Sequence, residues 1–340
     1  MRSLPRVYPL LPGEWFAPAL VGVVVAASLL PCRGGVAHAF DALAVLAIMS
    51  LFFLQGARLS REAVVAGMKN WRLHLGITSA TFVLFPLLGS AVVALFPAAL
   101  TPPLRIGLLF LCVLPSTVQS SIALTSIARG EVAGAICAAT ASNVVGVVLS
   151  PMLLAFLLRI RGGSMDLSGL WKILLELLVP FIAGNILRPW IGAWADRNRA
   201  ILAITDRGSI LIVVYTAFSA AVVNGIWHQL PSTMLGKLVL FDALLLAVVL
   251  ITIKLVSRLF AIPRRDEVAM VFCGSQKSVV TGVPMAHLLF AGPSAAIIVL
   301  PIMVYHLLQL LVGAWLARRY AAGFAAPIPS SPIGPHLAGR

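Results

Sequence analysis

The sequence predicts an all-α integral membrane protein with ten transmembrane helices, and three observations lead to this fold class. The 340-residue chain is 60% hydrophobic and 11% charged, whereas soluble domains are about half apolar and a quarter charged. Its apolar residues gather into runs that approach or exceed the roughly 20 residues needed to span a bilayer. Its 25 Lys and Arg residues cluster between alternate runs. Soluble enzyme classes are therefore excluded.

Ten apolar runs are the candidate spanning helices, because helices of this length satisfy their own backbone hydrogen bonds within lipid. They lie at residues 15–31, 38–57, 74–96, 103–128, 131–158, 168–190, 205–227, 235–259, 266–290 and 294–317. The first run follows two arginines, so a cleaved signal peptide is an alternative for it. The distribution of basic residues favours a retained helix.

The basic residues predict the orientation of the chain. With the N-terminus in the cytoplasm, 18 of the 25 Lys and Arg residues lie at cytoplasmic ends of the runs and six at outer ends. Such an excess is typical of cytoplasmic loops. We therefore expect a multi-pass protein of the cell inner (plasma) membrane with both termini cytoplasmic. The net charge of +14 then reflects contact with the lipid bilayer, and no nucleic-acid partner is expected.

Ten helices divide into two sets of five, which predicts an inverted repeat. A repeat with an odd number of helices inserts its second copy upside down, as in many secondary transporters. The predicted parts are a cytoplasmic N-terminus (1–14), the first repeat (15–158), an outer connecting loop (159–167), the second repeat (168–320) and a cytoplasmic Pro-rich tail (321–340). Corresponding helices of the two repeats should then share unusual features.

Helices four and nine both carry a polar interruption in mid-segment. In helix four, Pro115 precedes the polar run 116–121, and in helix nine Gly274 precedes the run 275–278. Pro removes a backbone donor and Gly weakens a helix. Broken helices in transporters offer free backbone groups to ions and substrates, and membranes tolerate such backbone only where it is buried or lines a cavity. A packing kink in each helix is the alternative interpretation.

The motifs of enzymes are missing from the sequence. The four cysteines show no paired spacing, and the chain contains no HExxH, GxSxG, Walker or GxGxxG pattern. These patterns mark zinc, hydrolase, ATP and dinucleotide sites. We therefore expect neither an enzyme nor an ATP-driven pump. No cofactor and no metal site is predicted, with Na⁺ or H⁺ as the candidate coupling ion.

The residues around both breaks resemble the bile acid:sodium symporter family, which is solute carrier family 10. The segment 115–151 carries this resemblance through residues 126–133 (SIARGEVA) and the pair Ser142-Asn143. The segment 272–285 begins FCGSQKS and is similar to the branch of human family member 7 and its bacterial relatives. The resemblance implies crossed, discontinuous helices four and nine within a core of helices three, four, five, eight, nine and ten. A panel of helices one, two, six and seven would rock against this core.

The family transports organic anions, usually together with sodium, but this chain departs from its sodium-site pattern. The sodium-binding Glu of helix nine aligns with Phe272, its Gln is kept as Gln276, and its next Asn aligns with Lys277. The Gln of helix three aligns with Thr81. Because sodium prefers a carboxylate among its oxygens and a nearby ammonium repels it, conventional two-sodium coupling is not expected.

Lys277 is the clearest candidate for a functional residue, since an ionisable group at mid-helix is costly and functional by default. It would either pair with a carboxylate, phosphate or sulfate of the substrate, or exchange a proton and so replace sodium. The alternatives are snorkelling or a structural pair with a buried acid such as Glu176. Glu176 itself is a candidate proton relay in helix six, and Asp242 of helix eight is expected to be interfacial.

The other candidates are polar side chains near the breaks. The Ser-Asn pair of the family matches either residues 120–121 or residues 121–122. The predicted substrate-binding residues are Lys277, Ser120, Ser121, Gln276, Ser278 and Asn143. The predicted cation or proton coupling residues are Gln276, Ser121, Thr140, Ser142, Lys277 and Glu176. Small polar residues also pack membrane helices together, which is the alternative role for this set.

The function that follows is secondary active transport of a small organic anion by alternating access. One alternative is a sodium-coupled symporter that uses the neutral oxygens of Gln276 and Ser121. Another is a non-transporting membrane regulator of ion homeostasis. The sequence leaves the substrate, the stoichiometry, the direction of transport and the oligomeric state open.

Overall fold

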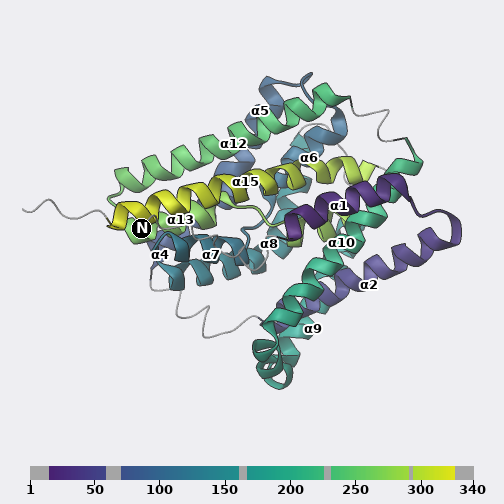
Figure 1. The fold of residues 1–340 in the computed structure, drawn as a ribbon, viewed down its shortest axis with the longest axis horizontal. Coiled ribbons are helices and arrows are strands. Elements are labelled where there is room, and N and C mark those ends of the chain that lie inside the picture. The colour runs from purple at the N-terminus through teal and green to yellow at the C-terminus, as the bar shows by residue number, and fades with distance from the viewer. Residues whose placement is uncertain (1–14, 59–69, 161–166, 226–230, 291–293, 326–340) are drawn as a thin grey trace, which may run out of the picture.

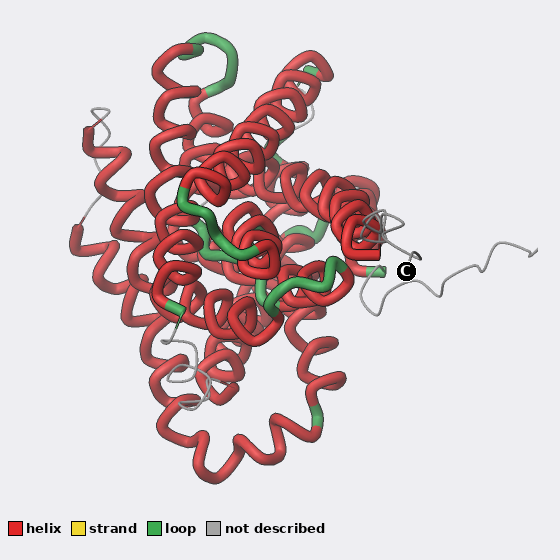
Figure 2. Tube along the Cα trace, turned by 90° about the vertical axis from the view of Figure 1, so that its left-hand side faces the viewer, coloured by secondary structure: helices red, strands yellow, loops and turns green. Residues whose placement is uncertain are grey.

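The computed structural model describes residues 15–58, 70–160, 167–225, 231–290 and 294–325 of the chain. These residues form helices joined by loops, without strands in the described ranges, as Figure 2 shows. The predicted N-terminal segment 1–14, most of the connecting loop 159–167 and most of the tail 321–340 lie outside the described residues.

Thirteen α-helices and one π-helical turn follow one another along the described chain. They are α1 (Phe16–Leu29), α2 (Gly34–Arg58), α4 (Trp71–Ser79), the π-helical turn η1 (Ala80–Leu84), α5 (Phe85–Leu95), α6 (Pro102–Val113), α7 (Gln119–Ile127), α8 (Val132–Ile160), α9 (Leu167–Arg197), α10 (Arg199–Val223), α12 (Ser232–Leu259), α13 (Arg264–Ser275), α14 (Val279–Leu289) and α15 (Ser294–Ala325).

The protein is an integral membrane protein with several spanning helices. Seven helices within the described ranges are long and apolar enough to cross a bilayer. Each of the ten predicted runs coincides with helix in the structure. The fourth and ninth runs do not reach spanning length as single helices, because each is divided into two short helices, α6 with α7 and α13 with α14. The first run also falls short, because α1 has 14 residues.

The helices pack into two groups. Helices α1, α2, α9 and α10 contact one another and lie on the right of Figure 1. A second group contains α6, α7 and α8 together with α12, α13 and α15, and these helices also contact one another. Helix α14 touches both groups, through α15 and through α10. This arrangement places both helix breaks inside the second group, where protein atoms surround them.

The first group is held by a close crossing of α2 and α9. Gly56 of α2 faces the backbone of Phe181, and Gly184 of α9 faces the backbone of Phe53 in return. Small residues at such crossings let two membrane helices approach backbone to backbone, so that van der Waals contacts can form along the interface. The crossing joins the first predicted repeat to the second.

Candidate functional site

The break in the fourth predicted helix begins where α6 ends. Helix α6 stops at Val113, Leu114 is extended (φ −66°, ψ 151°), and α7 starts at Gln119. Pro115 follows at once and supplies no N–H, so the helical hydrogen bonds cannot continue across it. The carbonyl oxygens at the end of α6 therefore need other donors, because buried backbone groups are almost always paired.

Side chains of α8 supply several of these partners. The Ser150 hydroxyl donates to the carbonyl oxygen of Val113 at 2.7 Å. Asn143 Nδ2 donates to the carbonyl oxygen of Ser116 at 2.7 Å. The N–H of Ser116 donates to the Ser142 hydroxyl at 3.0 Å. Asn143 and Ser142 were predicted as site residues, and in this structure they support the broken backbone of helix four.

The second break separates α13, which ends at Ser275, from α14, which starts at Val279. Gln309 of α15 pairs with the backbone of Lys277 on both sides: its Oε1 accepts from the N–H at 2.7 Å, and its Nε2 donates to the carbonyl oxygen at 3.0 Å. The Tyr305 hydroxyl donates to the carbonyl oxygen of Ser275 at 2.7 Å. Sequence reasoning missed Gln309 and Tyr305, although a glutamine within an apolar helix was the signal available.

The two breaks meet through side chains and backbone. Gln276 Oε1 accepts a hydrogen bond from the Thr117 hydroxyl at 2.8 Å and a second one from the Ser120 hydroxyl. The N–H of Ser278 donates to the carbonyl oxygen of Pro115 at 2.9 Å. Residues more than 150 positions apart in the chain thus form one polar cluster.

Ser121 extends this cluster toward α13. Its hydroxyl lies 2.9 Å from that of Thr117 and donates to the carbonyl oxygen of Phe272 at 3.2 Å. The phenyl ring of Phe272 packs edge-on against Tyr320, with ring centroids 6.3 Å apart. At this position the chain therefore offers a neutral backbone carbonyl to the cluster and no carboxylate.

The Lys277 side chain is enclosed, with 1% of its surface exposed. Its Nζ donates to the carbonyl oxygens of Thr81 (2.9 Å), Cys112 (2.9 Å) and Leu114 (2.8 Å). It also lies 4.0 Å from the centroid of the Phe85 ring. All three N–H groups of the ammonium are in use, so an anion could pair with it only by displacing one of these carbonyl oxygens.

Most of the predicted site residues come together, but two do not. The cluster at the breaks includes Ser120, Ser121, Gln276, Lys277, Ser278, Asn143 and Ser142. Thr140 is half-buried in α8 and makes no hydrogen bond with the described part of either break. Glu176 is exposed on α9, and no ion pair within the described ranges joins it to Lys277. The structural pair of Glu176 with Lys277, which was the alternative interpretation of Lys277, is therefore not seen.

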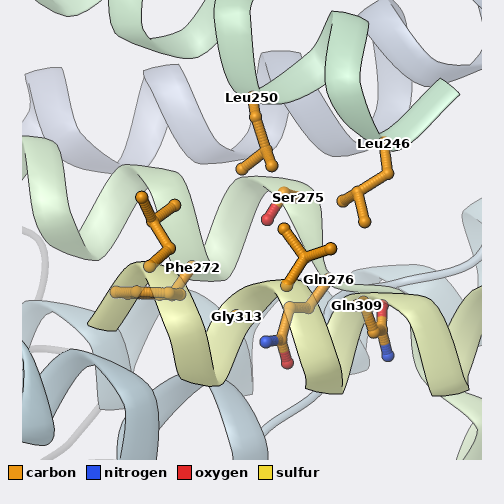
Figure 3. Close-up of a pocket in the computed structure, with 9 residues that line it drawn as sticks. Leu246, Leu250, Phe272, Ser275, Gln276, Gln309 and Gly313 are labelled. Atoms are coloured by element: carbon orange, nitrogen blue, oxygen red, sulfur yellow. The ribbon is translucent and has the colours of Figure 1, made fainter. Parts of the chain in front are cut away.

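A small cavity lies beside the second break, between α12, α13 and α15 (Figure 3). Gln276, Gln309 and Ser275 supply its polar side chains, and leucines supply most of its apolar wall. Gln276 Nε2 is buried and has no hydrogen-bond partner among the described residues. The cavity volume is about 10 Å³, which is far below the roughly 300–1,000 Å³ of typical ligand pockets. The conformation observed does not leave room for an organic anion there.

Asp242 of α12 differs from the interfacial residue that was expected. It is completely buried, and neither carboxylate oxygen has a hydrogen-bond partner among the described residues. It acts electrostatically on Cys112, which Lys277 also influences. A buried polar group without partners carries an unfavourable desolvation free energy, so Asp242 is a second functional candidate beside the breaks.

We expect Asp242→Leu to stabilise the folded protein by about 1–3 kcal/mol, because it removes the unpaired group and keeps a side chain of similar size. The measurement is the melting temperature of the purified protein in detergent. Asp41→Leu is the matched control, since Asp41 is exposed on α2 and should change stability little. A lower melting temperature for Asp242→Leu would mean that the carboxylate has a stabilising partner.

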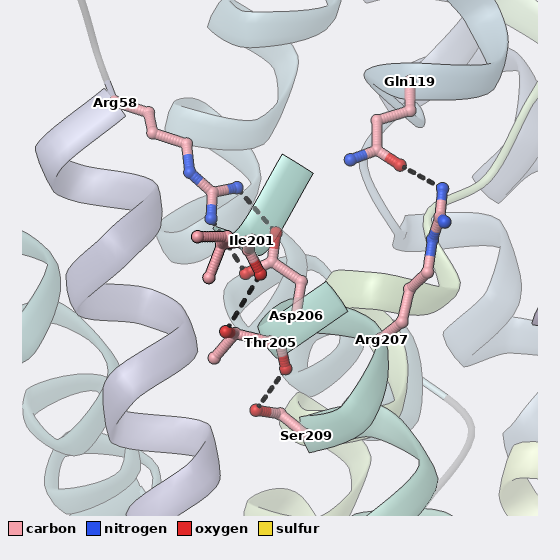
Figure 4. A network of polar contacts seen from close by, with 7 residues as sticks. All are labelled: Arg58, Gln119, Ile201, Thr205, Asp206, Arg207 and Ser209. Carbon is pink, nitrogen blue, oxygen red and sulfur yellow. Dashed lines mark hydrogen bonds and ion pairs between the residues drawn. The ribbon is translucent and has the colours of Figure 1, made fainter. Parts of the chain in front are cut away.

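Two arginine contacts involve helix α10 (Figure 4). Arg58 of α2 binds the Asp206 carboxylate of α10 through two hydrogen bonds of 2.6 and 3.1 Å, within the first group. Arg207 of α10 donates to Gln119 Oε1 at 3.1 Å, which connects the first group to the start of α7. The sequence assigned both arginines to orientation alone, whereas the structure gives each a specific partner.

Comparison with known proteins places residues 14–322 among transporters. The sequence model of the SBF-like CPA transporter family matches residues 14–322. The chain is 49% identical to Uncharacterized protein PA2026 of Pseudomonas aeruginosa, across 94% of this chain and 95% of that protein. It is 47% identical to Putative symporter YfeH of Escherichia coli K12, across 90% and 92%. It is 28% identical to Sodium/bile acid cotransporter 7 of Rattus norvegicus, across 93% and 94%.

Proposed function

This chain belongs to the SBF-like CPA transporter family, and from that premise we propose that it moves a small organic anion across the membrane by secondary active transport. Family membership confirms the resemblance that the two broken helices suggested. The observation that carries the proposal is the meeting of both breaks at Gln276, which accepts hydrogen bonds from Thr117 and Ser120. Half-helix ends facing each other in the membrane interior are a typical substrate and ion site of secondary transporters.

The proposed architecture is ten helices in two inverted repeats, residues 15–158 and 168–320. Its main support is that the interruptions fall in the fourth and ninth predicted helices, which correspond under this symmetry. The contacts among α6, α7, α8, α12, α13 and α15 are those expected of a core. The contacts among α1, α2, α9 and α10 are those expected of a panel.

Alternating access would then be a rocking of the panel against the core. The Arg58–Asp206 ion pair and the close approach of Gly56 to the Phe181 backbone favour a panel that moves as one body. The hydrogen bond from Arg207 to Gln119 spans the two groups, and it would have to break when the panel moves. The small size of the cavity beside the second break supports a closed conformation.

Anionic substrates are supported by the ends of the half-helices. The N-termini of α7 and α14 both begin at a break, and helix N-termini attract negative charge. The relatives named as a putative symporter and as sodium/bile acid cotransporters are consistent with anion transport coupled to an ion. Ser120, Ser121, Gln276, Ser278 and Asn143 would supply the hydrogen bonds to substrate or coupling ion.

The coupling ion is proposed to be a proton and not a pair of sodium ions. The cluster holds neutral oxygens, with Phe272 in place of a carboxylate, and an ammonium lies next to it. Asp242 is a buried group able to carry a proton at this depth. We place the protein in the inner membrane with both termini cytoplasmic, as the excess of basic residues on one side predicts.

Uptake by the reconstituted protein tests this function. Labelled carboxylates, sulfates and phosphates are offered to proteoliposomes under a sodium gradient or a proton gradient imposed separately. We expect accumulation of at least one anion under the proton gradient without sodium. Sodium-driven uptake alone would instead support the symporter that uses Gln276 and Ser121. No flux of any anion under either gradient would support the non-transporting regulator.

The same assay tests the site. Gln276→Leu removes the acceptor that joins the two breaks, and we expect at least a tenfold loss of uptake, since the two halves of the site would lose their shared contact. Ser126→Ala is the control, because Ser126 is exposed on α7 and should leave uptake unchanged. Unchanged uptake in Gln276→Leu would remove this cluster from the transport site.

A further inference from the structure

The environment of the Lys277 ammonium is built from main-chain oxygens. Three carbonyl oxygens lie 2.8–2.9 Å from Nζ, and the face of Phe85 lies on another side. These distances are those of charge-assisted hydrogen bonds. No carboxylate in the described part of the chain forms an ion pair with this ammonium. Carbonyl dipoles and an aromatic face therefore compensate its charge.

The three carbonyl oxygens are free because the sequence interrupts two helices beside them. Cys112 and Leu114 lie at the C-terminal end of α6, where the break at Pro115 leaves their oxygens without helical donors. Thr81 lies in the π-helical turn, in which the N–H of Phe85 donates to Ala80 instead. The next residue is Pro86, which has no N–H to offer to the Thr81 oxygen.

A cage of this composition is a general binding site for monovalent cations. Unwound carbonyls and the C-terminal ends of half-helices coordinate cations in membrane proteins, and rings of carbonyl oxygens replace the hydration shell of an ion. The C-terminal end of α6 adds the negative end of its helix dipole, and aromatic faces bind ammonium groups. The chain fills this cage with a cation of its own.

We propose that the Lys277 ammonium is a resident cation: it occupies a carbonyl cage that would otherwise bind a free monovalent cation, and it holds η1 and the two breaks together without one. The proposal rests on the proposed transport function, because it explains how the site stays assembled without sodium. It predicts that the cage remains a cation site when the side chain is shortened, with primary alkylammonium ions and potassium as its ligands.

Other charged or titratable side chains in this region do not compensate the charge of the Lys277 ammonium. Asp242 from α12 and Cys112 from α6 interact within the same region. Tyr305 from α15 donates its hydroxyl proton to the Ser275 carbonyl, and His306 contacts Gln309. None of these side chains lies within hydrogen-bond distance of Nζ, whose three donors are occupied by backbone oxygens.

The test is chemical rescue of Lys277→Ala. Alanine keeps Cβ, so the missing atoms correspond to a propylammonium ion. Full-length wild type, Lys277→Ala and Lys277→Met are purified in detergent, and their melting temperatures are followed with rising propylammonium chloride or potassium chloride. N-methylglucamine chloride, whose cation is too bulky for the cage, corrects for ionic strength. This readout does not require transport, so its failure is distinguishable from failure of the proposed function.

We expect both variants to melt below wild type. Only Lys277→Ala should then regain several degrees, in a saturable manner, with propylammonium or potassium. The methionine side chain keeps the cage filled with apolar atoms, so Lys277→Met should not respond. Equal shifts in all three proteins, no shift in Lys277→Ala, or a Lys277→Met protein as stable as wild type would each overturn the proposal.

A second measurement covers a Lys277→Ala protein that does not fold in ordinary buffer. Membranes containing this variant are solubilised with and without propylammonium chloride, and the monodisperse fraction is compared by size-exclusion chromatography. Recovery that depends on propylammonium supports the resident cation. Equal loss of monodisperse protein in both buffers contradicts it.

Discussion

Replacing Gly184 by alanine is expected to lower the stability of the folded protein by about 3 kcal/mol, since overpacking a tight interior contact has this order of effect. A Cβ at Gly184 would lie 1.9 Å from the carbonyl oxygen of Phe53, and one at Gly56 would lie 1.9 Å from that of Phe181. Both obstacles are backbone atoms, so a change of rotamer cannot relieve the clash. Helices α2 and α9 would have to separate.

The measurement is the melting temperature in detergent, which should fall by several degrees for Gly184→Ala and for Gly56→Ala. The matched control is Gly236→Ala in α12, where an added Cβ meets no atom within 4 Å. This control should be neutral or slightly stabilising, because alanine is the better helix former. If Gly184→Ala, Gly56→Ala and Gly236→Ala all had the same melting temperature, the close crossing of α2 and α9 would not be present in the membrane protein.

In these variants we expect the packing of the whole panel to loosen. Since α2 and α9 belong to different predicted repeats, loosening their contact would separate the repeats on the panel side. We therefore expect any transport activity to fall together with the melting temperature. Retained activity with lowered stability would mean that the α2–α9 crossing is not required for movement of the panel.

Replacing Gln309 by leucine is the second change with a large expected effect. Gln309 pairs with both backbone groups of Lys277, and its Nε2 also contacts His306 Nδ1 at 3.0 Å. Leucine has a similar size but makes none of these hydrogen bonds. The Lys277 N–H and carbonyl oxygen would remain buried without partners, at about 1–3 kcal/mol each. We expect a loss of stability of about 2–5 kcal/mol on this basis.

Gln119→Leu is the control for this change, because Gln119 is exposed at the start of α7 and its Oε1 accepts one exposed hydrogen bond from Arg207. Its effect on stability should be near the ±0.5 kcal/mol typical of surface substitutions. Melting temperatures of both variants are compared with wild type in one detergent. A Gln309→Leu protein as stable as Gln119→Leu would show that water or another donor satisfies the second break.

The sequence was most informative where a local rule applied. Runs of apolar residues predicted the helix positions. In the structure, most helices begin and end within a few residues of the ends of these runs. Pro115 and the polar residues after it predicted the break of helix four, because proline removes a backbone donor whatever the surroundings. Gln276 and Ser120 were predicted as site residues, and they share a hydrogen bond.

Sequence reasoning failed where the partner is distant in the chain. Gln309 was overlooked, since a single amide in a long apolar helix does not reveal which backbone groups it will pair with. Asp242 was expected near an interface, because position along a helix gives depth but not which side faces protein. Glu176 was considered as a proton relay or, alternatively, as a structural partner of Lys277, but its side chain is exposed on α9.

Membrane insertion, the positions of the helices, the two interruptions and the family are readable from the chain alone, because hydrophobicity, backbone donors and motifs are properties of short segments. The groups that contact the Lys277 ammonium cannot be predicted in this way. An ammonium in a membrane helix requires compensation, but carbonyl oxygens of Thr81, Cys112 and Leu114 are chemically the same as any others. Only the packing of η1, α6 and the second break brings these three within reach, and so a predicted substrate ligand becomes a cation enclosed by the protein's own backbone.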